Sequence, residues 1–198
     1  MTTAAIEEQR GLLQRGRRLK YATLGWNVVG VGILAVAAWN ARSVALVSFG
    51  LDSAIEIFAS VGVLWQLADH SDAERERRAT RLIGVAFLAL AVYIAAQTLY
   101  TVVAGSRPAP SALGVGWLAV TCVAMFALAY GKARTGTQLG NDTLSSEARV
   151  TIVDGLLAAA VLTGLVVNSA FGWWWADPAA GLVVLVYGAI EGVHALRS

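Results

Sequence analysis

The chain has 198 residues, of which 57% are hydrophobic and only 14% are charged. This composition excludes an ordinary soluble domain and indicates an all-α, polytopic membrane protein. The net charge of +2 is small, and the basic residues flank apolar runs without forming a separate patch, which argues against a nucleic-acid-binding surface. The single cysteine, Cys122, lies inside an apolar run, so an intramolecular disulfide is excluded.

The N-terminal stretch MTTAAIEEQRGLLQRGRRLK is basic and amphipathic, and no small-residue cleavage site follows the first apolar run. We therefore expect residues 1–20 to be a retained cytoplasmic arm and residues 21–198 to form one six-helix membrane domain. A spanning helix needs about 20 mostly apolar residues. The six runs of this kind are Tyr21–Trp39, Ser43–Leu67, Leu82–Ala104, Leu113–Gly131, Val150–Ala170 and Ala176–Leu196.

The connections between these runs differ in charge. They are NAR, a charged loop ADHSDAERERRATR, the turn GSRPAPS, a polar loop KARTGTQLGNDTLSSEAR, and FGWWW. Of the 15 basic residues, only Arg42 and Arg107 fall on the side opposite the arm. Because Lys and Arg mark cytoplasmic loops, both termini are predicted to be cytoplasmic, with Trp39 and Trp173–Trp175 in an aromatic belt at the outer interface.

Two acids lie inside the second apolar run. Asp52 and Glu56 are four residues apart, so they share one face of a helix. Asp52 follows Ser43 by nine residues, or about 13 Å, which is near the middle of a bilayer. An acid there costs about 2.5–3.5 kcal/mol and marks an ion or proton site by default. A protonated, hydrogen-bonded packing pair is the alternative.

Asp154 is the acid of the fifth run, and it enters from the inner side on an antiparallel helix. If the second and fifth runs are neighbours, Asp52, Glu56 and Asp154 converge on a cation site built from oxygen ligands. Asn27 supplies an uncharged oxygen donor nearby. Glu147 lies seven residues before Asp154, at the inner mouth.

Other polar residues have structural interpretations that we favour. Asp177 precedes Pro178 and is expected to cap the sixth helix. Glu191 is expected to pair with His194 or with an arginine of the arm. The loop that carries Asp69, His70 and Asp72 has groups suited to a metal, although a solvated charged loop is the preferred interpretation.

Glycines of the sixth run have the spacing of close helix packing. Gly188 and Gly192 form a GxxxG pair, and Gly181 lies on the same face. This face predicts either packing within the bundle, which we favour, or a dimer contact.

Three segments resemble the membrane domain of the cation diffusion facilitator family. SVALVSFGLDSAIEIFAS looks like that family's second helix, with Asp52 and Glu56 on its two metal-binding positions. SSEARVTIVDG resembles the start of the fifth helix, where the family usually has His-x-x-x-Asp. Asp154 matches the aspartate, but Val150 stands at the histidine position. WWWADPAAGLVVLVYGAIEG looks like the sixth helix with its Asp-Pro opening. The resemblance covers roughly residues 20–196.

The resemblance implies a divalent-cation transporter that exports a metal from the cytoplasm in exchange for protons, with the metal ion as substrate and no prosthetic group. Members of that family usually continue into a cytoplasmic metal-binding domain that dimerises. The resemblance therefore implies a short relative that consists of the membrane domain alone. With Val150 in place of histidine, Asp52, Glu56 and Asp154 form a harder ligand set, which suits Mn²⁺, Fe²⁺ or Mg²⁺ at least as well as Zn²⁺.

A second hypothesis is a degenerate, non-transporting membrane protein that binds metal or a partner, which Val150 and the short chain favour. An intramembrane enzyme is disfavoured because no Ser/His or Cys/His pair lies within the apolar runs. We expect a homodimer formed through the membrane helices or the arm. The richness in Ala, Gly and Val and the excess of Arg over Lys suggest a bacterial chain, which places it in the inner membrane.

Overall fold

A computed structural model describes residues 3–68 and 73–197. Within these ranges, side chains are described except at residues 3–6, 8, 59, 60, 62–79, 142 and 143. All regular structure in the described ranges is helical, which confirms the all-α prediction. The helices are α1 (Thr3–Ala41), α2 (Val44–Ala68), α3 (Ala73–Val103), α4 (Ala112–Leu139), α5 (Asp142–Phe171) and α6 (Ala176–Arg197).

Five of these helices, α1 and α3 to α6, are long and apolar enough to cross a membrane. They carry many exposed large hydrophobic side chains, which is the pattern expected when the solvent is lipid. The prediction of a polytopic membrane protein is thereby supported for these five. The second span stays a prediction, because the side chains of α2 are described only in part.

The helices extend further than the apolar runs. α1 begins at Thr3, so the residues assigned to a cytoplasmic arm continue the first helix without a break. Most of the predicted charged loop before the third run belongs to α3, which begins at Ala73. The helices therefore reach beyond the apolar runs that were used to locate them.

The prediction of a polar loop between the fourth and fifth runs was wrong. α4 continues to Leu139, α5 starts at Asp142, and the reversal takes only two residues. Gly140 adopts a left-handed conformation (φ 58°), which glycine accepts at the end of a helix. The side chain of Asn141 then accepts a hydrogen bond from Leu144 N at 2.9 Å and caps α5.

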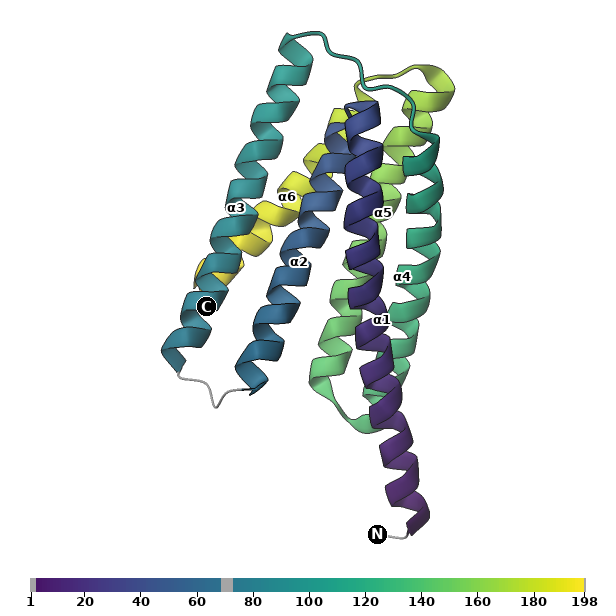
Figure 1. Ribbon diagram of the computed structural model, residues 1–198, viewed down its shortest axis with the longest axis vertical. Coiled ribbons are helices and arrows are strands. Elements are labelled where there is room, and N and C mark those ends of the chain that lie inside the picture. The colour runs from purple at the N-terminus through teal and green to yellow at the C-terminus, as the bar shows by residue number, and fades with distance from the viewer. Residues whose placement is uncertain (1–2, 69–72, 198) are drawn as a thin grey trace.

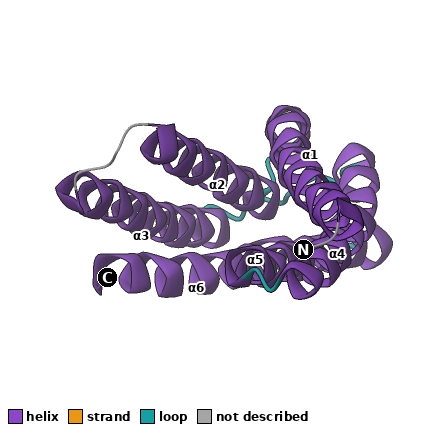
Figure 2. Ribbon diagram, turned by 90° about the horizontal axis from the view of Figure 1, so that it is seen from below, coloured by secondary structure: helices purple, strands orange, loops and turns teal. Residues whose placement is uncertain are grey.

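The six helices lie in two connected groups (Figure 1, Figure 2). α4 packs against α5 and α1, while α6 crosses obliquely to lie along α3, and α2 contacts α1, α3, α5 and α6. The connections α1–α2, α3–α4 and α5–α6 lie at one end, which we call the Arg42 end. The α4–α5 turn and the N-terminus lie at the other, the N-terminal end (Figure 1).

The glycine face of α6 packs within the chain. An added Cβ at Gly192 would lie 2.9 Å from Leu88 Cγ and 3.0 Å from Gly84 O on α3. One at Gly181 would lie 3.3 Å from Val44 Cγ1 on α2. The structure therefore favours the intramolecular interpretation of this face, since α2 and α3 already cover it.

Asp177 has a different role from the predicted one. Its Oδ1 atom accepts hydrogen bonds from the backbone N–H groups of Val44 (2.9 Å) and Ala45 (3.3 Å), and its Oδ2 atom accepts one from Ser43 Oγ. It therefore caps the start of α2 from α6. The prediction that Asp177 caps its own helix missed this long-range contact, which fixes the start of α2 at Val44, eight residues before Asp52.

Candidate cation site between α2 and α5

The helix α2 holds the two acids singled out from the sequence. Asp52 is 2% exposed, and Glu56 follows one turn later in a half-buried position. The Oδ1 atom of Asp52 is buried without a hydrogen-bond partner among the described residues. A buried oxygen of this kind costs free energy unless a proton or a cation satisfies it.

Asp154 joins this pair from α5. The two helices are in contact, as the predicted convergence requires. Asp52, Glu56 and Asp154 line one small cavity, where a proton or a cation would offset the repulsion between their carboxylates. Asp154 is 6% exposed, and its Oδ1 atom also lacks a partner among the described residues. The three predicted ligands thus belong to one cluster.

Asp154 lies deeper in its helix than the sequence suggested. Twelve residues separate it from Asp142, the first residue of α5, so it stands about 18 Å along the helix. The expected start at Val150 had placed it one turn from the helix end.

Asn27 of α1 completes the polar cluster. Its Nδ2 atom donates a hydrogen bond to Glu56 Oε2 at 3.1 Å. The sequence suggested Asn27 as an oxygen donor to a metal, whereas here its amide nitrogen faces the carboxylate. In this arrangement Asn27 orients Glu56.

A cavity of about 10 Å³ lies beside the cluster. Asn27, Asp52, Glu56 and Asp154 line it together with Thr121 and the stacked indoles of Trp26 and Trp117, among others. Its volume is close to that of one water probe. The space next to the three acids therefore suits one small ion or one water molecule.

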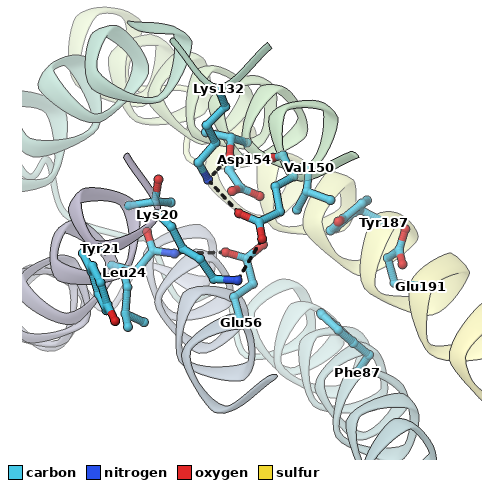
Figure 3. Close-up of a pocket in the computed structure, with 14 residues that line it drawn as sticks. Lys20, Tyr21, Leu24, Glu56, Phe87, Lys132, Val150, Asp154, Tyr187 and Glu191 are labelled. Carbon is cyan, nitrogen blue, oxygen red and sulfur yellow. Dashed lines mark hydrogen bonds and ion pairs between the residues drawn. The ribbon is translucent and has the colours of Figure 1, made fainter. Parts of the chain in front are cut away.

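A larger cavity of about 340 Å³, which we call the vestibule, is also lined by Glu56 and Asp154 of the cluster (Figure 3). Asn27, Glu56 and Asp154 line both cavities and so form the partition between them. The vestibule is large enough to hold several water molecules. It extends to Lys20 and Glu147, toward the N-terminal end of the bundle.

Val150 stands in the vestibule wall, one turn before Asp154, and is 49% exposed. The position where the resembled family has histidine therefore faces the space in front of the acids (Figure 3). A longer side chain here has room to extend into the vestibule.

Sequence reasoning missed Lys132, which the structure places in the vestibule wall. Its Nζ atom donates a hydrogen bond to Thr151 Oγ1 at 3.0 Å and lies 3.8 Å from Glu147 Oε2. The residue is only 3% exposed. The predicted loop hid it, because the apolar run ends at Gly131.

The spacing of residues along α4 could have indicated that Lys132 is buried. With α4 extended to Leu139, Lys132 falls on one buried face of the helix. The buried residues of that face are Leu118, Thr121, Met125, Ala129 and Lys132.

Glu147 is held by two lysines rather than left free at the mouth. Lys20 Nζ of α1 donates to Glu147 Oε1 at 2.9 Å, while Lys132 approaches the other oxygen. Glu191 of α6 lines the same vestibule beside Tyr187 (Figure 3). The vestibule is therefore lined by four carboxyl groups and two amines, and carries a surplus of acid.

The cluster is not a preformed metal cage. Across the part of the chain that the structure describes, no group of three or more His, Cys, Asp or Glu side chains stands ready to hold a metal ion. The loop residues Asp69, His70 and Asp72 lie outside the described residues. Comparison with models of known protein families finds no match, and comparison with curated proteins finds none either.

Proposed function

We propose that the chain is a divalent-cation transporter whose substrate passes the carboxylate cluster of Asp52, Glu56 and Asp154 in exchange for protons. The observation that carries this proposal is the pair of buried oxygens, Asp52 Oδ1 and Asp154 Oδ1, which have no hydrogen-bond partner among the described residues. They lie next to a cavity of about 10 Å³. Oxygens left in this state suit a cation or protons as alternating occupants.

The two cavities suggest a route. A hydrated cation enters the vestibule, whose acid surplus attracts it. It then loses water as it exchanges hydration for the oxygens of Glu56 and Asp154 in the partition. Protons that hold those oxygens leave as the cation binds, because the same lone pairs serve both. Binding in the small cavity requires the three carboxylates to draw together around the ion.

The ligand chemistry supports Mn²⁺, Fe²⁺ or Zn²⁺ as substrates. Three carboxylates provide a hard, oxygen-only set, and Val150 adds no nitrogen ligand. We further propose export from the cytoplasm, with both termini on the cytoplasmic side of a bacterial inner membrane. The Lys and Arg distribution supports this orientation, since only Arg42 and Arg107 fall at the Arg42 end. A homodimer remains part of the proposal.

The test is metal flux into proteoliposomes that enclose a metal-sensitive dye, with Mn²⁺, Fe²⁺ and Zn²⁺ supplied separately under an imposed pH gradient. Asp52→Asn and Asp154→Asn keep the side-chain size and should abolish protein-dependent flux. Glu7→Gln removes an exposed acid near the start of α1 and serves as the matched control. Wild-type flux in Asp52→Asn would overturn the assignment.

A non-transporting, metal-binding or partner-binding membrane protein is the second candidate. The observation that favours it is the pairing of Glu147 with Lys20 and Lys132, by which amines of the chain occupy part of the acid-lined space. Saturable cation binding to purified protein, with no flux for any metal of the panel, would support this candidate over transport.

A further inference from the structure

A third cavity, separate from the carboxylate cluster, lies at the Arg42 end of the bundle. It is a groove of about 630 Å³ between α1, α2 and α3, and it shares no lining residue with the small acid cavity except Leu34. Apolar side chains such as Val31, Ala35 and Val47 form most of its walls. Nothing in the proposed transport route uses this groove.

The groove has the length of one membrane leaflet. Its lining runs from Arg42 back to Val31 on α1, which is eleven residues or about 16 Å. On α2 it runs from Ser43 to Ala54, again about 16 Å. Half of a hydrocarbon core of about 30 Å is about 15 Å. An acyl chain of a single leaflet therefore matches the groove along its axis.

The open end of the groove carries a cation. Arg42 lines the groove and is exposed, and its guanidinium makes no hydrogen bond or ion pair with any residue that the structure describes. Arg42 is the one non-glycine residue with positive φ (51°) in the described ranges. This backbone conformation reverses the chain between α1 and α2 and holds the side chain at the groove mouth.

Aromatic residues mark the membrane interface at the same level. Trp39 is 86% exposed and Tyr100 63% exposed, and both line the groove near Arg42. Trp173 and Trp175 stack on each other in the α5–α6 connection, which lies at the same end of the bundle. Indole and phenol rings prefer the headgroup level. Arg42 is thus placed where lipid phosphates lie, above an apolar slot.

We propose that this groove binds one anionic phospholipid of the membrane, with its acyl chain along α1, α2 and α3 and its phosphate group on Arg42. The guanidinium offers paired donors suited to phosphate. Gln97 and Thr101 of α3, which also line the groove, supply polar contacts below the headgroup. The charge of the headgroup, rather than the acyl chain alone, then determines which lipid binds in the groove.

The test is native mass spectrometry of the full chain in detergent, titrated with phosphatidylglycerol or with phosphatidylcholine. We expect one phosphatidylglycerol to bind in preference to phosphatidylcholine. Arg42→Gln should weaken phosphatidylglycerol binding about five- to tenfold, as expected for one basic residue at a lipid headgroup. Arg107→Gln is the matched control, because Arg107 is the other basic residue at this end and does not line the groove.

A second pair of variants tests the groove itself. Ala35→Trp fills the slot and should abolish the bound lipid, whereas Val36→Trp, on an exposed neighbouring position outside the lining, should leave it. Unchanged circular dichroism controls for folding. Equal losses in Arg42→Gln and Arg107→Gln, or no loss in either, would overturn the proposal. So would loss in Ala35→Trp with phosphatidylglycerol and phosphatidylcholine bound equally, which would indicate a neutral lipid slot.

Discussion

Lys132 Nζ lies 3.0 Å from Thr151 Oγ1, and Thr151 precedes Asp154 by three residues on α5. The hydrogen bond places a lysine amine beside the carboxylate cluster, where its charge would oppose cation binding at the proposed site. Lys132→Gln removes this charge and keeps a donor for Thr151. We expect divalent-cation affinity to rise about tenfold in isothermal titration calorimetry.

Lys20→Gln is the control for that change. Lys20 also pairs with Glu147, but its side chain is 35% exposed, so solvent screens its charge. Its effect on cation affinity should be clearly smaller. If both variants change the affinity equally, Lys132 has no special position relative to the site.

The bond between Asp177 and the start of α2 predicts a loss of stability without a change in cation affinity. Asp177→Ala leaves the buried N–H groups of Val44 and Ala45 without their acceptor, at a cost of about 2 kcal/mol. The midpoint of thermal unfolding in detergent should fall. Asp177→Asn keeps one oxygen acceptor, so its unfolding midpoint should lie between those of the wild type and Asp177→Ala. An unchanged midpoint for Asp177→Ala would contradict this role.

The sequence predicted the fold correctly wherever a helix coincides with an apolar run. Along the apolar runs the two coincide, so the number and order of the helices in the described residues were predicted correctly. At the ends they do not, because capping rather than hydropathy sets where a helix stops. Gly140 and Asn141 end α4 and start α5 inside a stretch that composition alone describes as a polar loop.

The candidate site was predicted in the same partial way. Asp52, Glu56 and Asp154 were found because a charge in an apolar run is conspicuous. Lys132 was missed because it follows an apolar run, and its burial depends on α4 continuing. The role of Asp177 depends on a contact between α6 and α2, which spacing along the chain does not reveal.

Val150→His tests the metal preference of the site. The side chain at position 150 faces the vestibule one turn from Asp154, so an imidazole there adds a nitrogen ligand beside the carboxylates. We expect Zn²⁺ to gain on Mn²⁺ in competitive flux or binding by about tenfold or more. Val150→Leu, which adds volume without a ligand, should leave the ratio as in the wild type. A shift of equal size in both variants would refute a ligand effect.

Gly164→Ala tests the close packing of α5 on α6. An added Cβ would lie 2.6 Å from Ala180 Cβ and 2.7 Å from Ala176 O, so the backbones must separate. We expect a loss of about 1–3 kcal/mol, seen as a lower unfolding midpoint. Gly25→Ala on α1 is the control, since nothing lies within 4 Å of its added Cβ. Equal midpoints for the two variants would show that the α5–α6 contact adapts.

The length of α1 has a mechanical consequence. Its 39 residues span about 58 Å, whereas a bilayer with its headgroups is about 40–45 Å thick. One helix without a break therefore connects Asn27, hydrogen-bonded to Glu56, with an N-terminal segment that would project past the headgroups of a bilayer spanned by this chain. A spectroscopic label on that projecting segment would move with Asn27, so rearrangement at the buried carboxylates can be followed from outside the lipid.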